Sequence, residues 1–315
     1  MTRTWIVPVV AALALFALPA VLTPYTQDLV VKIAIYAVFA LSLELLVGVT
    51  GLVSLGHAAF LGIGAYVTVL AAGDSGGSIA TVAPLAVLAA AGYALFVGAL
   101  SLRTKGVYFI MVTLAFAQMA YFVFHDTKLA GGSDGLFLYA KPALGALNLD
   151  DKRHLYYTVI VTLVATYALL ALLMRARFGH ALAGIRVNEQ RMRAAGFATF
   201  GYKLAAFVIA GALAGLAGFL LAIKDGAVNP ELLSWHESGA VLLMLILGGI
   251  GSLRGAVIGA IAFTLLKELF QLESLLGPVA SHWQMTLGFT IIAFVALLPK
   301  GLIGLRSRFS GAAHG

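Results

Sequence analysis

The sequence predicts an all-α fold, a polytopic bundle of transmembrane helices with about eight to ten spans. Three observations lead to this fold class. The 315 residues are 62% hydrophobic and 10% charged, with a mean hydropathy of +1.02, whereas soluble domains usually contain about 25% charged residues. Apolar runs long enough to cross about 30 Å of hydrocarbon recur along the whole chain. Basic residues gather in alternate connecting segments, as the positive-inside rule requires.

The apolar runs follow one another from the first residues to the last. The run at 5–23 follows Arg3 and lacks a small-x-small cleavage site, so we expect a retained first helix rather than a signal peptide. The next runs cover residues 29–48, 53–72, 79–101, 106–124, 155–174 and 203–223. The last three cover residues 237–250, 256–270 and 284–299. The first two of these three are short and joined through Gly248–Ser252, so they are two spans, one broken helix or a re-entrant pair.

These runs divide the chain into an N-terminal transmembrane helix (1–28), a main transmembrane domain (29–305) and a tail (306–315). An internal loop at 175–203 interrupts the main domain. Small residues spaced by four in Gly211–Gly218 predict close packing between helices.

The charges set the orientation. If the N-terminus is cytoplasmic and every run crosses, the cytoplasmic segments hold most of the 20 basic residues but, of the 13 acidic residues, only Glu189. The basic residues are Arg3, Arg103, Lys105, Arg175, Arg177, Arg186, Arg191, Arg193, Lys203, Arg254, Lys300, Arg306 and Arg308. We therefore expect both termini in the cytoplasm. The net charge of +7 then comes from Lys and Arg residues kept in cytoplasmic loops next to lipid headgroups, and does not indicate a nucleic-acid partner.

Two connecting segments are long. Residues 125–154 are predicted to be external and turn-rich, with Ala130–Gly135 as the clearest turn. The internal loop, 175–203, predicts an amphipathic helix. Its apolar face carries Ala181, Leu182, Ile185 and Met192, and its polar face carries Arg186, Glu189, Gln190 and Arg193. Such a helix lies on anionic headgroups or docks into a soluble partner, and the pattern leaves both open.

The sequence has no constellation for chemistry. It has no cysteine, no glycine-lysine phosphate loop and no H-E-x-x-H, and its seven histidines are scattered. We predict no catalytic residue, no metal site and no cofactor. Transport is the remaining class of function.

Few ionisable residues lie inside the predicted spans. Away from the first and last residues of the runs, they are Lys32, Glu44, Lys267 and Glu268, with His57 in a glycine-rich segment near Ser54. A charge at mid-membrane costs about 2.5–3.5 kcal/mol and often marks a functional path. Glu44, Ser54 and His57 are therefore candidates for a substrate pathway. The alternative for Glu44 is a position near a helix end or a structural hydrogen bond between helices, whereas Lys32 is expected to snorkel without function.

Five sequence blocks occur in a characteristic order. They are Gly51–Tyr66, Gly131–Leu136, Arg177–Glu189, Lys203–Gly218 and Leu247–Leu253. Together, over roughly residues 30–305, they resemble the family of branched-chain amino acid ABC permeases, and most closely its LivM-type subunits. Glu44 departs from the family, where a neutral amide is more usual.

The resemblance implies a permease of the ABC-importer type in a bacterial inner membrane. Its partners would be a second, LivH-type permease, two cytoplasmic ATPase subunits that use the ATP, and a periplasmic binding protein that delivers Leu, Ile or Val. The loop 179–197 would be the element that couples to an ATPase. Arg186, Asn188, Glu189, Ala195 and Gly196 match that region.

Two alternatives stay open at this stage. Similar permeases carry urea, amides or other amino acids, and more distant ones carry sugars. An ion-coupled secondary transporter would need carboxylates in the membrane, and Glu44 and Glu268 are its candidates.

Overall fold

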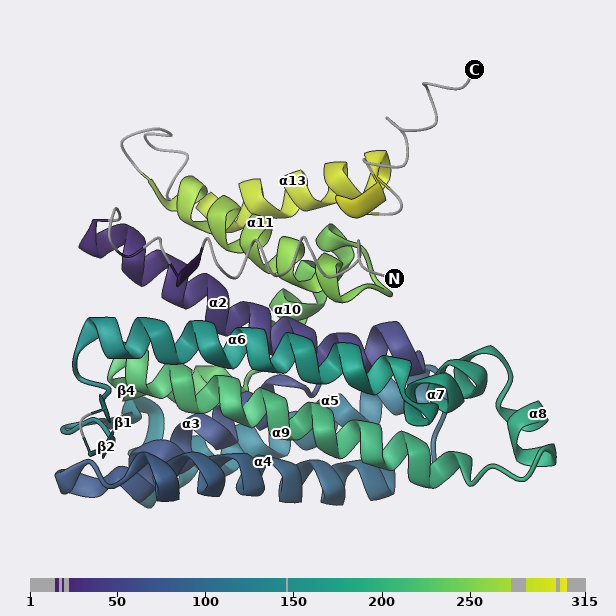
Figure 1. Cartoon of the computed structure of the whole chain (residues 1–315), viewed down its shortest axis with the longest axis horizontal. Coiled ribbons are helices and arrows are strands. Elements are labelled where there is room, and N and C mark those ends of the chain that lie inside the picture. The colour runs from purple at the N-terminus through teal and green to yellow at the C-terminus, as the bar shows by residue number, and fades with distance from the viewer. Residues whose placement is uncertain are drawn as a thin grey trace.

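The computed structural model describes residues 15–16, 19, 23–145, 147–272, 282–298 and 301–304. These residues form a bundle of long helices that lie roughly along one direction, with short strands at one end and two short helices at the other (Figure 1). The all-α polytopic fold class is confirmed. The predicted first span, 5–23, lies outside the described residues except for positions 15, 16, 19 and 23, and so does the tail, 306–315.

Six helices of the described chain are long and apolar enough to cross a membrane. They are α2 (Pro24–Glu44, extended by the π-helical η2, Leu45–Thr50), α3 (Ala58–Ala72), α4 (Ile79–Ser101), α5 (Val107–Asp126), α6 (Lys152–Arg175) and α9 (Thr199–Asp225). They coincide with the apolar runs predicted between residues 29 and 223.

Helix α2 begins earlier than its apolar run, because its start carries local helix signals. The Thr23 hydroxyl accepts a hydrogen bond from the Thr26 amide, and Pro24 occupies the first helical position. The predicted division between residues 28 and 29 therefore falls inside α2.

The two short runs after α9 form a bent pair. Helix α10 (Trp235–Gly248) and helix α11 (Leu253–Gln271) meet at an angle of 114°. The described chain thus has six candidate spans, or seven if the bent pair is one span. Because the bend exceeds a right angle, α11 turns back toward the side from which α10 comes. The shorter apolar helix α13 (Trp283–Leu297) follows.

The core lies where α2, α3 and α9 pack together, with α4 also lying against α3 and α9. Glycines permit this close approach. A β carbon at Gly64 would collide with the backbone of Gly215, and one at Gly218 would collide with the carbonyl of Leu61. The small residues of α9 therefore serve backbone-to-backbone packing, as predicted.

The predicted external loop folds onto the end of α9. Strand β1 (Leu136–Phe137) pairs antiparallel with β4 (Ala227–Val228), and β2 (Ala143–Leu144) pairs with β3 (Leu147–Asn148). The short helices of this end are η3 (Gly73–Ser75), η4 (Lys128–Ala130), η5 (Gly132–Asp134) and η6 (Pro230–Leu233). The loop thus has more order than its turn-rich composition predicts.

The predicted span 53–72 is wrong at its start, because residues 51–57 are not helical and α3 begins only at Ala58. Gly51 has a left-handed backbone (φ 74°), which ends the π-helical turn η2. The buried hydroxyl of Ser238, on α10, accepts a hydrogen bond from the Ala58 amide at 2.9 Å. A residue 180 positions away therefore satisfies a free donor at this helix start.

Replacing Ser238 by alanine is expected to destabilise the chain by about 1–3 kcal/mol, because the Ala58 amide would lose its acceptor in a buried site. A thermal unfolding curve of the detergent-purified protein measures the loss. Ser133→Ala, at an exposed site in η5, serves as the control. Equal melting temperatures for both variants would show that the Ser238 bond contributes nothing.

Candidate functional site

The internal loop folds as two helices rather than the single amphipathic helix that the sequence predicts. Helix α7 (Arg177–Val187) and helix α8 (Glu189–Ala194) are separated at Asn188, whose backbone is extended. The Asn188 side chain accepts a hydrogen bond from the Arg191 amide at 2.9 Å and so caps α8. Glu189 in the first turn and Arg193 in the last turn suit the helix dipole.

The apolar face of the loop is placed as predicted. Ala181, Leu182 and Ile185 are buried, and Met192 is half-buried. They anchor α7 and α8 to the bundle.

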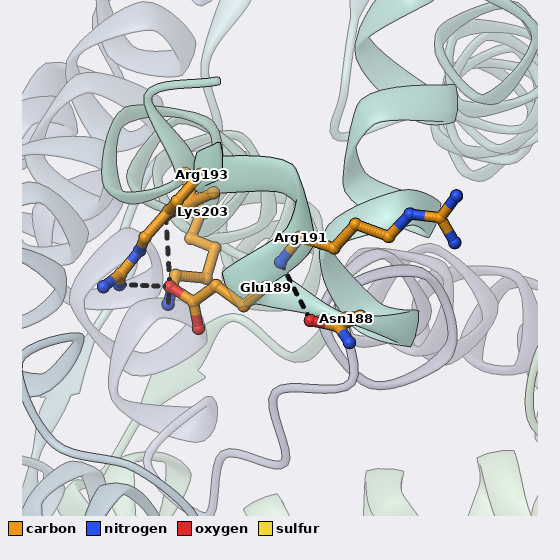
Figure 2. A network of polar contacts seen from close by, with 6 residues as sticks. Asn188, Glu189, Arg191, Arg193 and Lys203 are labelled. Carbon is orange, nitrogen blue, oxygen red and sulfur yellow. Dashed lines mark hydrogen bonds and ion pairs between the residues drawn. The ribbon is translucent and has the colours of Figure 1, made fainter. Parts of the chain in front are cut away.

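Glu189 lies at the centre of a cluster of polar contacts (Figure 2). Its Oε1 accepts hydrogen bonds from Arg193 Nη2 at 2.5 Å, Lys203 Nζ at 2.9 Å and Thr199 Oγ1 at 3.1 Å. Lys203 and Thr199 belong to the first turns of α9. The side chain of Arg191 extends away from this group (Figure 2). Glu189 therefore ties α8 to the membrane helix that follows.

The charges of this cluster set the pKa of Glu189. Burial alone would raise the pKa, but Lys203 and Arg193 outweigh it and, with Thr199, lower it from the ordinary value of 4.5 to about 2. A lowered pKa means that the folded state prefers the carboxylate. The stabilisation by Glu189 is thus present above pH 4.5 and is lost as the pH falls toward 2.

We therefore expect α8 to stay attached from neutral pH down to about 4.5 and to loosen only between 4.5 and 2. A nitroxide on Ala194→Cys would report this as increased mobility in its electron paramagnetic resonance spectrum, and the native chain has no cysteine to remove. A label on Leu88→Cys in α4 controls for general unfolding. Mobility at Ala194 that increases already at pH 6 would contradict the pKa.

The turn after α8 is exposed. Ala194 and Ala195 are exposed, and Gly196 has a left-handed backbone (φ 86°) with open space beside it. Small side chains at a protruding turn leave room for a partner's surface to approach closely.

The Arg186 side chain points toward the membrane helices and not toward the exposed turn. Its Nη1 donates a hydrogen bond to the carbonyl of Gly48, in η2. A β carbon at Gly51 would lie 3.2 Å from its Cγ, so the side chain also covers Gly51. The five coupling candidates thus have three roles: Arg186 contacts the membrane domain, Asn188 and Glu189 build α8, and Ala195 and Gly196 are exposed.

The three pathway candidates, Glu44, Ser54 and His57, are fully buried, with 0% exposure. Glu44 Oε1 accepts a hydrogen bond from the Gly251 amide at 2.7 Å, and Ser54 Oγ accepts one from the Gly56 amide at 3.3 Å. The structure therefore gives Glu44 and Ser54 separate partners.

His57 links α2 to α3. Its Nε2 lies 2.8 Å from Ser42 Oγ, which donates a hydrogen bond to the Phe39 carbonyl. The His57 ring stacks on Phe39 and meets the edge of Phe60. Because the Ser42 proton is used on Phe39, the bond to His57 requires a proton on Nε2.

The Glu44 contact joins α2 to the segment between α10 and α11, and the pathway role of the three residues stays a prediction. Among the residues that the structure describes, no three histidine or acidic side chains gather as a metal site.

Comparison with known proteins gives the family. Residues 25–296 match the family model described as "Branched-chain amino acid transport system / permease component". The chain belongs to this permease family. The resemblance carried by the five sequence blocks is thereby confirmed, and the six candidate spans make the permease a multi-pass membrane protein.

Individual relatives agree with the family. The permease is 29% identical over 311 residues to the high-affinity branched-chain amino acid transport system permease protein LivM of Escherichia coli, covering 91% of this chain and 72% of LivM. It is 27% identical to LivH of the same organism over 146 residues, 46% of each chain. It is 24% identical to BraD of Pseudomonas aeruginosa, covering 89% of this chain and 96% of BraD. No solved structure gives a significant match.

The three other ionisable residues singled out in the predicted spans, Lys32, Lys267 and Glu268, have partners. Lys32 Nζ lies 3.9 Å from Glu268 Oε2, and Tyr25 donates a hydrogen bond to Glu268 Oε1 at 2.5 Å. Lys267 lies 5.4 Å from the ring centroid of Trp283. Lys32 thus forms an ion pair between α2 and α11 rather than only snorkelling.

Sequence reasoning missed the partners of its own candidates. Ser42, Ser238, Gly251 and Thr199 are small polar residues or glycines with no local signal. Only the approach of distant helices gives them a function.

Proposed function

We propose that this permease is the channel-forming subunit of an ATP-driven importer for branched-chain amino acids, Leu, Ile or Val. The observation that carries the proposal is the family match over residues 25–296. The names of LivM and BraD, both permease proteins of high-affinity branched-chain amino acid transport systems, support the substrate class.

The proposed assembly has a second permease of the LivH type. LivM and LivH of Escherichia coli carry the name of the same transport system and are both similar to this chain, which supports a pair of related but different permeases. A periplasmic binding protein would deliver the amino acid to the end of the bundle that carries β1–β4.

Two cytoplasmic ATPase subunits would supply the energy, and one of them would dock on α7 and α8. The exposed turn at Ala195 and Gly196 supports this docking surface, because it protrudes and is built from small residues. The permease itself would carry out no chemistry and bind no cofactor, and ATP would be hydrolysed only by its partners.

The proposed location is a bacterial inner membrane with both termini in the cytoplasm. The basic residues of α7 and α8 lie at the end of the bundle opposite the strands (Figure 1), which supports a cytoplasmic position for that end. The bend between α10 and α11 returns the chain to the outer side, so that α13 runs inward again.

Co-purification from native membranes followed by reconstitution tests the proposal. The tagged permease is expected to bring with it a second permease and two ATPases. With the binding protein and ATP, the assembly is expected to take up leucine, isoleucine or valine in preference to urea. Uptake of urea or another amino acid alone would overturn the proposed substrate. Uptake by the isolated chain in a proton gradient would instead establish an ion-coupled carrier.

A further inference from the structure

Two glycine-rich breaks of similar sequence lie next to one another at the cytoplasmic half of the bundle. The first follows α2 and η2 and contains Gly51-Leu-Val-Ser-Leu55, and the second joins α10 to α11 and contains Gly249-Ile-Gly-Ser-Leu253. Gly51 (φ 74°) and Gly251 (φ 96°) both have backbones that favour glycine. Each break ends an inward-running helix and precedes the start of the next one.

Glu44 joins the turn η2, which leads into the first break, to the second break. Its carboxylate lies against Gly48, where any β carbon would collide with it, and accepts the Gly251 amide at 2.7 Å. This amide lies just before the first turn of α11, so the carboxylate faces the positive end of that helix. A glutamate with 0% exposure thus holds α11 to α2 by one directed bond.

Arg186 joins the first break to the cytoplasmic helices. Its guanidinium bonds to the carbonyl of Gly48, the residue against which the Glu44 carboxylate lies. The charge of Arg186 also acts on the Glu44 carboxylate. Three segments far apart in the sequence, namely the end of α7, the turn η2 and the α10–α11 break, therefore meet at Gly48.

The second break has a further contact on its other side. The Leu302 amide donates a hydrogen bond to the Leu247 carbonyl at 2.9 Å, and Gly301 packs against the backbone of Gly248 and Gly249. The segment after α13 is thus in direct contact with the second break. A movement of the α10–α11 bend would change the position of α11 and of this segment together.

We propose that Arg186 and Glu44 form a relay that transmits movement of α7 to the bend between α10 and α11. Arg186 moves η2, and Glu44, seated on η2, moves the start of α11. Both are positioning residues, since neither needs to touch the substrate. The relay deepens the proposed function and rests on it, because an ATPase must move α7.

The test uses the complete assembly of permease, second permease, ATPases and binding protein, with cysteine-free partner subunits. Spin labels are placed on Ile250→Cys in the break and on Leu88→Cys in α4, which are 45% and 66% exposed in the native chain. The distance between the labels is measured by double electron–electron resonance, with and without ATP trapped by vanadate. ATP is expected to shift this distance in the assembly with native Arg186 and Glu44.

Variants locate the relay. Arg186→Ala and Glu44→Leu are expected to abolish the shift and to lower leucine uptake about tenfold, the factor that corresponds to one lost hydrogen bond of a charged group, while ATP hydrolysis continues. Glu44→Gln keeps an oxygen that accepts the Gly251 amide and is expected to retain the shift. Asp28→Leu removes an acid from the outer end of the same helix, where it pairs with Lys224, and is the matched control.

The outcomes separate the two proposals. If ATP shifts the distance by the same amount in the unsubstituted assembly and in the Arg186→Ala and Glu44→Leu variants, the relay is overturned and the importer stands. If ATP produces no shift even in the unsubstituted assembly although that assembly takes up leucine, the relay is likewise overturned and the importer stands. If the assembly shows neither the shift nor ATP-driven leucine uptake, the proposed function fails and the relay fails with it. If Glu44→Leu does not fold, Arg186→Ala alone tests the relay. This variant is expected to fold, because the buried apolar face of α7 still anchors the helix.

Discussion

Replacing Gly218 by valine is expected to prevent the permease from accumulating as a folded chain. A β carbon at this position in α9 would collide with the Leu61 carbonyl and lie 2.9 Å from the Ala65 amide nitrogen of α3. Overfilling a core that can repack costs about 1–3 kcal/mol. Backbone atoms of a neighbouring helix cannot rotate away as side chains do, so we expect a loss of at least about 3 kcal/mol here.

Fluorescence-detected size exclusion of a tagged chain measures this effect as loss of the monodisperse peak. Gly92→Val is the control, because Gly92 also lies inside a membrane helix, α4, but has open space beside it. The control is expected to retain the peak. If Gly218→Val gave the same peak as Gly92→Val, the close crossing of α3 and α9 would be wrong.

Replacing Glu189 by alanine is expected to leave the permease in the membrane but to reduce ATP-driven uptake about tenfold, because the hydrogen bonds from Thr199 and Lys203 that hold α8 to α9 end on its carboxylate. The Lys203 side chain, 8% exposed, would lose this acceptor. Helix α8 would then be free to move against α9, so that docking of an ATPase no longer drives the membrane helices.

Uptake of radiolabelled leucine into proteoliposomes, divided by the amount of permease, measures the loss. Asp74→Ala, an exposed acid in η3 at the opposite end, is expected to transport normally. Glu189→Gln keeps an accepting oxygen without the charge and should lie between the two. Full uptake by Glu189→Ala would exclude a coupling role for this cluster.

The sequence by itself determined the class of this protein. Hydrophobic runs near 20 residues identify membrane helices wherever they occur, because the hydrocarbon thickness is the same for every span. The position of basic residues adds the expected orientation, and α4 and α6 match their apolar runs within a few residues. The apolar face of α7 was also predictable, since helical spacing is a local property.

Local pattern failed where a residue's partner is distant in the sequence. The run 53–72 is mainly apolar, yet α3 begins only at Ala58, where Ser238 of α10 accepts the hydrogen bond of the Ala58 amide. The break at Asn188 was missed because a single capping side chain does not change the periodicity of the residues around it.

The roles of the candidate residues were decided only by the tertiary structure. Glu44 is conspicuous in the sequence as a charge among leucines, but a lone buried acid fits a pathway, an ion site or a structural bond equally well. Its contact with Gly251, 207 residues away, places its carboxylate at the start of α11. Arg186 is likewise one basic residue among several until the fold brings Gly48 to its guanidinium. Hydrophobicity is additive along the chain and can be read from it, whereas a directed hydrogen bond depends on where two distant helices meet.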